Sequence, residues 1–255
     1  MSFINAIIVF IFGIAIGSFL NVVIFRLPHE QTLTGRSKCP DCGKVLGFWE
    51  LWPIVSFILL KGKCAGCGKK ISWRYPAVEA ITALLFFFAW WQANPQAPAE
   101  WVLVLQMWIL AAFCIVVFII DFEHYLILDS IVFPLAGVFV LINFSLDLLY
   151  HHSSFDISLS GFLGALTGVL PFYLIWKLSQ GKLMGLGDVK LMLPLGLVLG
   201  WPKILAALFL AVFLGSIIGI ALLVADKKTL KSLLPFGCFL ALGAFVAQVY
   251  GQNVI

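Results

Sequence analysis

Long apolar stretches recur along almost the whole sequence, from Phe3 to Tyr250. A soluble domain is about 25% charged, whereas only 11% of this chain is Asp, Glu, Lys or Arg and 62% is hydrophobic. A transmembrane helix needs about 20 predominantly apolar residues, and several stretches approach that length. The sequence therefore predicts an all-α polytopic membrane protein and excludes an ordinary water-soluble fold.

About eight transmembrane helices are expected. The candidate spans are 3–25, 76–92, 101–120, 130–149, 159–176, 191–200, 204–225 and 233–250. The first stretch has no basic segment before it and no small-residue cleavage site, so it is interpreted as a retained span and not as a signal peptide. The stretch 191–200 is short and contains Pro194, so we expect it to be tilted, broken or joined to its neighbour. Seven spans are the alternative.

Nearly all Lys and Arg residues lie in loops that fall on one side when successive loops are assigned to alternate sides. Fifteen of the sixteen fall in loops 26–75, 177–190 and 226–232, and Lys203 is the exception. Cytoplasmic loops are enriched in Lys and Arg, so these three loops are predicted to be cytoplasmic and both termini periplasmic. This distribution accounts for the net charge of +4 through membrane topology, and no nucleic-acid partner is expected.

Three parts are predicted along the chain: a first transmembrane helix at 1–25, a cytoplasmic domain at 26–75 and a membrane core at 76–255. A domain of about fifty residues is too small for a self-sufficient hydrophobic core and needs a staple. Within it, Phe48–Leu60 is apolar but shorter than a span. Such a segment is typical of chain that lies in the membrane interface or folds back on the bundle.

Two Cys-x-x-Cys pairs, separated by 21 residues, lie in the cytoplasmic domain. They are Cys39, Cys42, Cys64 and Cys67. Four thiolates at this spacing can surround one Zn²⁺ tetrahedrally and leave no open position for a catalytic water, which predicts a structural zinc site. Lys44, Lys69 and Lys70 would offset its negative charge. Two redox-active dithiols are the alternative, disfavoured because cytoplasmic thiols stay reduced.

Two aspartates lie at ends of predicted spans on the cytoplasmic side. Asp121 follows the apolar run Phe113–Ile120, and Asp188 lies in the segment Gly185–Lys190, where two glycines are expected to make the backbone flexible. Ionisable groups at such positions are functional candidates. Two neighbouring carboxylates share one proton, so one can act as a base on water while the other acts as an acid. An aspartyl dyad for peptide hydrolysis is therefore predicted.

The alternative is that both aspartates pair with Lys182 or Lys190 at the level of the lipid headgroups. Asp129 begins a span and is expected to cap its helix or to orient the dyad. The other charged neighbours, Glu123 and His124, are interpreted as bystanders. Cys114 and Cys238 lie in apolar spans and are interpreted as ordinary small hydrophobic residues.

Other peptidase chemistries match the sequence less well. The chain has no His-Glu-x-x-His motif of a zinc protease and no Gly-x-Ser-x-Gly elbow of a serine hydrolase. Ser179 and Lys182 form only a weak candidate for a serine–lysine pair, because nothing else in the sequence orients them.

Several segments together resemble the type IV prepilin peptidase family, in the Gly-x-Gly-Asp class of intramembrane aspartyl proteases. They extend over nearly the whole chain: Gly17–Pro28, the four cysteines, Ile71–Pro76 with Glu79, Ile120–Asp121, Gly185–Lys190 and Pro235–Gly237. One departure is visible, because family members commonly have Leu-Pro-Asp where this chain has Ile127-Leu128-Asp129. The missing proline affects how the helix after Asp121 is expected to begin.

The resemblance implies that Asp121 and Asp188 are catalytic and that Gly185, Gly187 and Lys190 belong to the active-site loop. It implies a bacterial inner-membrane protein whose substrate is a type IV prepilin or a type II secretion pseudopilin. The family cuts after a glycine, between a short basic leader and an apolar helix. The residues specify neither the individual pilin nor an oligomeric state.

Many family members also methylate the new amino terminus with S-adenosylmethionine, and the resemblance extends this activity to the cytoplasmic loop. No glycine-rich nucleotide-binding loop and no domain large enough for a Rossmann methyltransferase are present. The residues that match the family's pattern in the loop are Glu50, Pro53, Ser56, Gly62 and Arg74. Each of them also has an alternative role in capping, packing or interfacial charge.

Two other classes of function are alternatives to an enzyme. A proton-linked membrane transporter would also use intramembrane aspartates, but it would be expected to show repeated halves, which this sequence lacks. A scaffold for assembly of a pilus or secretion machine would use the cysteine domain for docking and would not need either aspartate.

Overall fold

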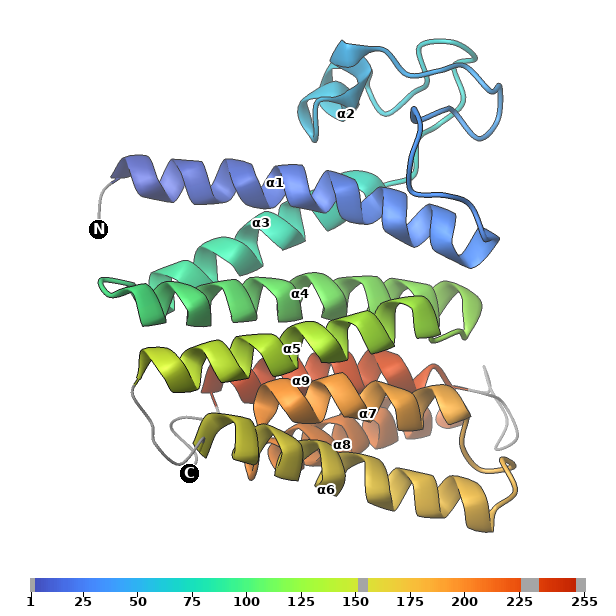
Figure 1. Cartoon of the computed structure of the whole chain (residues 1–255). Coiled ribbons are helices and arrows are strands. Elements are labelled where there is room, and N and C mark those ends of the chain that lie inside the picture. Colours follow the sequence, from blue (N-terminus) through green and yellow to red (C-terminus); the bar gives the residue numbers. More distant parts are fainter. Residues whose placement is uncertain (1–2, 151–155, 226–233, 251–255) are drawn as a thin grey trace. The chain divides into compact units, whose positions relative to one another are not determined.

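The computed structural model describes residues 3–150, 156–225 and 234–250. These residues form helices, turns and two isolated β-bridges, without any strand, so the predicted all-α class is confirmed. Figure 1 shows the order of the elements along the chain. The long helices are α1 (Phe3–Arg26), α3 (Arg74–Ala93), α4 (Pro98–His124), α5 (Asp129–Leu149), α6 (Asp156–Leu178), α7 (Leu186–Leu199), α8 (Lys203–Val224) and α9 (Phe236–Tyr250).

Each predicted span corresponds to one of these helices, but the helices differ in their capacity to cross a membrane. Six of those described are long and apolar enough, namely α1, α3, α4, α5, α6 and α8. The 14 residues of α7 and the 15 of α9 extend only about 21–23 Å at about 1.5 Å per residue. The hydrocarbon core is about 30 Å thick, so the number of crossings stays a prediction.

The short stretch around Pro194 is one continuous helix, α7, which contains the proline and is separate from α8. The expectation of a broken or fused helix is therefore wrong. Nine of the 14 residues of α7 are buried, and the helix packs against α5, α6, α8 and α9. A helix surrounded by other helices can tolerate an internal proline, because neighbouring groups satisfy the backbone that the proline frees.

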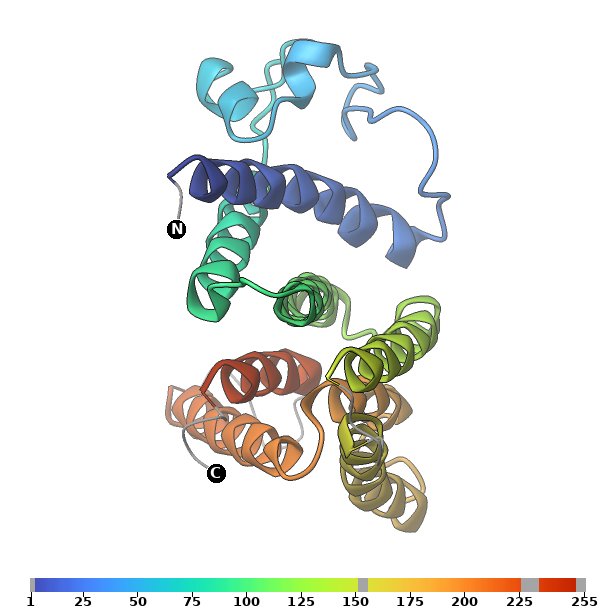
Figure 2. The same cartoon turned by 60° about the vertical axis from the view of Figure 1, so that its left-hand side comes forward.

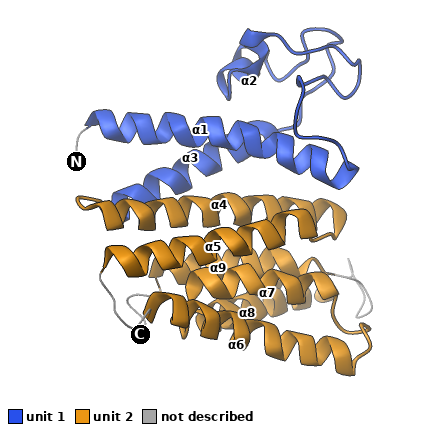
Figure 3. Cartoon of the chain, viewed as in Figure 1, with its two compact units in different colours: residues 1–94 blue, residues 95–255 orange. Residues whose placement is uncertain are grey.

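The chain divides into two compact units, residues 1–94 and 95–255, coloured separately in Figure 3. The boundary falls after α3, whereas the division expected from the sequence lies before α3, at 75–76. The reason is that α3 packs closely along α1 within the first unit.

Glycines on α1 allow this close packing in the first unit. A Cβ atom added at Gly13 would lie 2.6 Å from Cα of Ala83, and one added at Gly17 would lie 2.6 Å from Cα of Glu79. Small residues spaced four apart let two membrane helices approach until their backbones touch. The segment Gly17–Pro28 therefore includes part of a helix-packing surface.

The loop between α1 and α3 is tied to both helices by hydrogen bonds. Arg26 donates to backbone carbonyls of the chain from Thr32 to Arg36 and so folds the start of the loop. Asn21 donates to the carbonyl of Tyr75 over 3.1 Å. Glu79, only 7% exposed, accepts the N–H of Ile54 over 2.7 Å.

The apolar segment Phe48–Leu60 forms two short elements, the 3₁₀ helix η2 (Phe48–Leu51) and the helix α2 (Val55–Leu59). Trp49 is 74% exposed and Leu59 is also 74% exposed. Such side chains suit the boundary between water and lipid, where aromatic residues gather. The interfacial location stays a prediction.

In the second unit, α6 packs beside α7 and α8 beside α9 (Figures 1 and 2). Glycines again permit close packing, because the space beside Gly196 of α7 is filled by the backbone of Ala165 on α6.

Gln106 donates to Asn143 over 3.0 Å, and Asn143 donates to the carbonyl of Leu197 over 2.8 Å. This buried chain of amides links α4, α5 and α7, and hydrogen-bonded polar groups of this kind fix how helices pair in an apolar surrounding.

Candidate active site and metal centre

Asp121 lies in the last turn of α4 and is 5% exposed. Its Oδ2 accepts the backbone N–H of Cys238, in the first turn of α9, over 3.1 Å. The first N–H groups of a helix have no partner within it and carry partial positive charge, so they are suited to receive a carboxylate. The helix α4 then ends at His124, where Tyr125 takes a left-handed conformation and donates its N–H to the carbonyl of Asp121.

Asp188 lies in the first turn of α7, which has Gly185 as its N-cap. The side chain is partly buried. Gly187 lies within the helix and has no positive φ, so the expected flexible loop around Gly187 and Asp188 is wrong. A helical first turn gives Asp188 a defined direction, which a flexible loop would not.

Gly187 is required because a neighbouring side chain leaves little room for a Cβ atom, and not because the backbone must be flexible. A Cβ atom added at Gly187 would lie 3.0 Å from Cβ of Ile127, in the link between α4 and α5. The same isoleucine lies beside Gly237, where an added Cβ would be 3.2 Å from Cδ1 of Ile127 and 2.8 Å from Oδ2 of Asp121. The starts of α7 and α9 thus both pack against Ile127.

This packing brings the two aspartates into one region of the second unit. Asp121 lies against Gly237 and Asp188 follows Gly187, and both of these glycines pack against Ile127. Two carboxylates that come close together do not both ionise readily, so one of them holds a proton. The arrangement can therefore supply one acidic and one basic group.

Lys190 binds a third carboxylate, Asp129. Its Nζ lies 2.7 Å and 2.9 Å from the two carboxylate oxygens of Asp129, at the start of α5. Within the described chain, neither Asp121 nor Asp188 forms an ion pair with a lysine, so the alternative of pairing with Lys182 or Lys190 finds no support.

Asp129 does not cap α5, because Leu128 is the N-cap residue and no side chain caps it. The expected capping role is therefore wrong. Without the family's proline, α5 still starts regularly, since the N–H groups of Ile131 and Val132 both reach the carbonyl of Leu128. The pair of Asp129 and Lys190 instead joins the start of α5 to the start of α7.

The four cysteines of the first unit form one cluster. All four sulfur atoms lie within 4.8 Å of one another, and none is in a disulfide. With Zn–S bonds of about 2.3 Å, the sulfurs of a tetrahedral site lie about 3.8 Å apart, so the donor set fits one Zn²⁺ with little adjustment. The cluster favours a single metal site over two separate dithiols.

Each half of the cluster is built by the same turn, and we call residues 38–45 the first knuckle and residues 63–70 the second. In both, the first cysteine exchanges backbone hydrogen bonds with the residues that follow the second cysteine. Gly43 and Gly68 have φ of 71° and 73°, a conformation that glycine adopts without strain. The N–H groups of Cys67 and Gly66 lower the pKa of the Cys64 thiol to about 7, which favours the thiolate that binds metal.

Two of the lysines beside the knuckles are held by acids. Lys44 lies 2.8 Å from Glu50, and Lys69 lies 2.7 Å from Asp41. Bonding to Glu50 raises the pKa of Lys44, and bonding to Asp41 raises that of Lys69. Lys70 instead lines a pocket beside α3.

The five methyltransferase candidates are all in the first unit, in different settings. Glu50 accepts the N–H of Gly47 and pairs with Lys44, and these two contacts hold its pKa below the usual value. Pro53 precedes α2 and Ser56 lies in it, Gly62 turns with φ of 66° after α2, and Arg74 is the first residue of α3. No described contact joins all five, so no step of methyl transfer is derived from them, and their role stays a prediction.

Two contributors to the region around the aspartates were missed by reading the sequence. Cys238 is buried as expected, but its backbone N–H binds Asp121 and its thiol donates to the carbonyl of Phe118. Ile127 packs against both Gly187 and Gly237. Only the resemblance at Pro235–Gly237 indicated that the start of α9 matters. A backbone N–H donor cannot be recognised from the type of residue that carries it.

Comparison with known proteins identifies the same two regions. Residues 11–93 match the model of the Bacterial Peptidase A24 N-terminal domain, and residues 108–220 match that of the Type IV leader peptidase family. The first match coincides closely with the first compact unit, and the second includes both Asp121 and Asp188.

Relatives similar over most of the chain carry one name, prepilin leader peptidase/N-methyltransferase. The Bacillus subtilis protein is 34% identical, over 97% of this chain and 95% of its own length. The Pseudomonas aeruginosa protein is 31% identical, over 95% and 89%. The Myxococcus xanthus protein is 35% identical over 88% of this chain, which spans only 64% of that relative. No solved structure shows significant similarity. With two domain models matched in order and such relatives aligned almost end to end, the chain belongs to the type IV leader peptidase family.

Proposed function

We propose that this protein is an intramembrane aspartyl endopeptidase of the bacterial inner membrane, which removes the short basic leader of type IV prepilins or type II secretion pseudopilins after a glycine. The observation that carries the proposal is that Asp121 and Asp188, at the ends of two helices, adjoin glycines that pack against the same residue, Ile127, within a chain of this family. The names of the relatives support the same substrate class.

In the proposed reaction, the ionised aspartate takes a proton from a water molecule as that water attacks the scissile carbonyl. The protonated aspartate donates a hydrogen bond to the carbonyl oxygen and later gives a proton to the departing amine. The N–H of Cys238 keeps Asp121 in place from the start of α9. This contact makes Asp121 the better held of the pair, while Asp188 is carried on the first turn of α7.

The substrate's own shape fits a site at the end of a membrane helix. A prepilin has an apolar helix that stays in lipid and a basic leader that stays in water, so the cut lies where lipid meets water. Asp121 lies in the last turn of α4 and Asp188 in the first turn of α7, and both are predicted to lie on the cytoplasmic side. The proposal therefore places the zinc domain and the active site on the cytoplasmic side.

We also propose that the protein methylates the amino group released by cleavage, with S-adenosylmethionine as methyl donor. The support is the shared name of the relatives and the match to the N-terminal family domain. In this proposal Cys39, Cys42, Cys64 and Cys67 hold Zn²⁺, which stabilises the fold of the loop and takes no part in cleavage.

The experiment mixes detergent-solubilised full-length protein with a prepilin and, separately, with a pseudopilin. Leader loss is followed by mass spectrometry, and methyl transfer by label from S-adenosylmethionine. We expect cleavage after a glycine without the methyl donor, and label only on the newly exposed amino terminus when it is added. If neither precursor is shortened, while proteoliposomes couple the flow of protons down a pH gradient to the uptake of a solute, the protein is a transporter and the proposal fails.

A further inference from the structure

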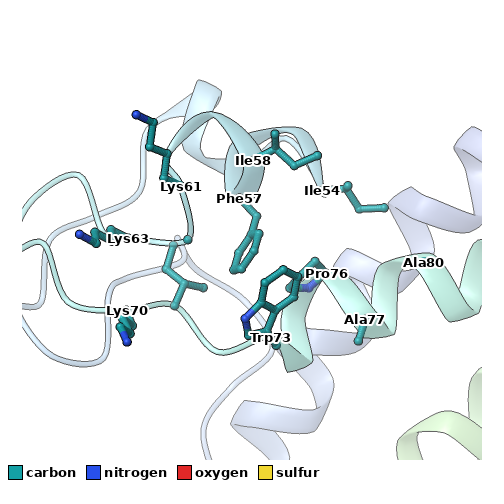
Figure 4. A pocket seen from close by; sticks show the side chains of 12 residues that line it. Ile54, Phe57, Ile58, Lys61, Lys63, Lys70, Trp73, Pro76, Ala77 and Ala80 are labelled. Carbon is teal, nitrogen blue, oxygen red and sulfur yellow. The ribbon is translucent and has the colours of Figure 1, made fainter.

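A pocket of about 870 Å³ lies in the first unit, between α2, the second knuckle and the first turns of α3. Its lining has two different ends. Figure 4 shows Lys61, Lys63 and Lys70 to one side of Phe57 and Trp73, whereas Ile54, Ala77 and Ala80 lie to the other side. Three lysine residues therefore stand at one end of the pocket, and small apolar residues stand at the other.

The backbone of the second knuckle fixes two of the lysines as a pair. Lys63 and Lys70 face each other in an antiparallel β-bridge. The flanking hydrogen bonds run from Ile71 to Gly62 and from Cys64 to Lys69, so the lysines occupy the non-hydrogen-bonded site, where side chains are closest. Since successive residues point to opposite faces, Cys64 faces the metal cluster and Lys63 faces away from it.

These three lysines have no acidic partner among the described residues. All three lysine residues are exposed, and within the described residues none forms an ion pair. Like charges directly opposite each other in a β-bridge are destabilising. By contrast, Lys44 and Lys69 on the metal side each have an acid. An anion between Lys63 and Lys70 would remove the repulsion.

The apolar end leads onto a candidate membrane span. The rings of Phe57 and Trp73 lie 4.8 Å apart between centroids, and Trp73 is 75% exposed. Beyond them, Ala77 and Ala80 line the pocket from the first turns of α3, which is long and apolar enough to cross a bilayer. Small side chains there leave room along the helix for a hydrocarbon chain.

We propose that this pocket binds an anionic glycerophospholipid, with the phosphate between Lys63 and Lys70, assisted by Lys61, and an acyl chain along the start of α3. Lysine clusters beside a membrane span attract anionic lipids. A basic leader peptide or the sulfonium of S-adenosylmethionine would meet repulsion at the same lysines. The proposal does not depend on the peptidase activity, because Asp121 and Asp188 take no part in it.

The test uses purified full-length protein in a neutral detergent and measures bound lipid by native mass spectrometry. The probes are dioleoyl phosphatidylglycerol, which is anionic, and dioleoyl phosphatidylcholine, which is zwitterionic with the same acyl chains. The variants are Lys63→Gln/Lys70→Gln and Ala77→Phe. Lys38→Gln is the matched control, because Lys38 is exposed and stands in the first knuckle where Lys63 stands in the second, but does not line the pocket.

We expect the parent to bind phosphatidylglycerol at least tenfold more tightly than phosphatidylcholine. A lysine near an anionic headgroup accounts for about a fivefold change in affinity, so the double variant should lose roughly 30-fold for phosphatidylglycerol. Lys38→Gln should bind as the parent does. Ala77→Phe, which fills the apolar end away from the knuckle, should weaken binding of both lipids. Zinc content, measured for every variant, identifies loss of the fold.

Each of the following results would overturn the proposal. One is equal affinity of the parent for the two lipids, and another is equal loss in Lys38→Gln and in Lys63→Gln/Lys70→Gln. The third is displacement of phosphatidylglycerol by a small soluble competitor at a similar concentration. Displacement by glycerol 3-phosphate would mean that the site binds free phosphate esters, and displacement by S-adenosylmethionine would assign the pocket to the methyl donor. If Lys63→Gln/Lys70→Gln loses zinc, its lipid affinity reports loss of the fold, and the test then depends on Ala77→Phe. Unchanged binding of both lipids by Ala77→Phe also contradicts the proposal.

Discussion

The backbone N–H of Cys238 donates a hydrogen bond to the carboxylate of Asp121, although the two residues are 117 positions apart in the sequence. This bond joins the end of α4 to the start of α9. It satisfies one of the N–H groups that a helix leaves unpaired at its start. The position of Asp121 therefore depends on α9 as well as on its own helix.

Gly237→Ala should disturb the active site without preventing membrane insertion. The added Cβ would lie 2.8 Å from Oδ2 of Asp121, too close to be accepted without a shift. Overpacking of this kind costs about 1–3 kcal/mol, and a displaced catalytic group can reduce the rate about 100-fold. Prepilin cleavage by solubilised protein measures the effect. Gly137→Ala is the control, because no atom lies within 4 Å of its added Cβ, and equal activity of the two variants would contradict this account.

Lys190→Gln should lower cleavage by roughly tenfold with little loss of stability. The ion pair with Asp129 is partly exposed, so it contributes no more than about 1 kcal/mol to folding. Its removal frees the start of α7, which carries Asp188. Exchange of the two residues, Asp129→Lys with Lys190→Asp, should recover part of the activity lost in Lys190→Gln. If the exchange variant is less active than Asp129→Lys alone and than Lys190→Asp alone, the ion pair does not position the start of α7.

Metal analysis should find one zinc per chain. Structural zinc contributes about 10–16 kcal/mol of apparent binding energy in small zinc-finger peptides, so Cys39→Ser or Cys64→Ser should lose the metal and expose the loop to protease. Cys114→Ala, on α4, should keep full zinc content. Because the cluster is in the first unit and both aspartates are in the second, methylation should fall before cleavage does. Full methylation by a stable, zinc-free variant would show that the loop does not need the metal.

Glu79→Leu should release α2 from α3, whereas Glu79→Gln should not. The carboxylate of Glu79 accepts the N–H of Ile54, which is held at φ 58°, a conformation that isoleucine rarely adopts. A side chain without an acceptor leaves that N–H unpaired, at a cost of about 1–3 kcal/mol. Glutamine keeps an acceptor oxygen. Hydrogen exchange over Ile54–Leu59 should quicken in the leucine variant alone, and the same exchange in both variants would refute the role assigned to Glu79.

Much of the fold was predictable from the sequence, because hydrophobic length determines where membrane helices lie. The short helix α7 was not, since Pro194 was taken as a break and only packing against four neighbouring helices shows why an unbroken helix forms. The grouping of the four cysteines was predictable, because the residue type and the spacing of the two pairs indicate it.

The region around the aspartates was predictable only in its acidic residues. Asp121 and Asp188 are recognisable by chemistry, but the N–H of Cys238 and the side chain of Ile127 act through position alone. Gly187 was assigned to flexibility, whereas the structure shows that it makes room for Ile127. Asp129 was expected to cap its helix or to orient the dyad, and it does not cap α5 but binds Lys190, a residue 61 positions away. Contacts between distant segments cannot be derived from local pattern.

The central claim is that Asp121 and Asp188 act together on one peptide bond. The most direct measurement is leader removal from a prepilin by membranes containing Asp121→Asn, Asp188→Asn or the parent at equal abundance. Because each carboxylate has a separate duty in moving protons, we predict that either substitution lowers the rate by more than about 1,000-fold, and that the double variant is no worse than either single one. Normal trimming of the precursor by either single variant would contradict the account.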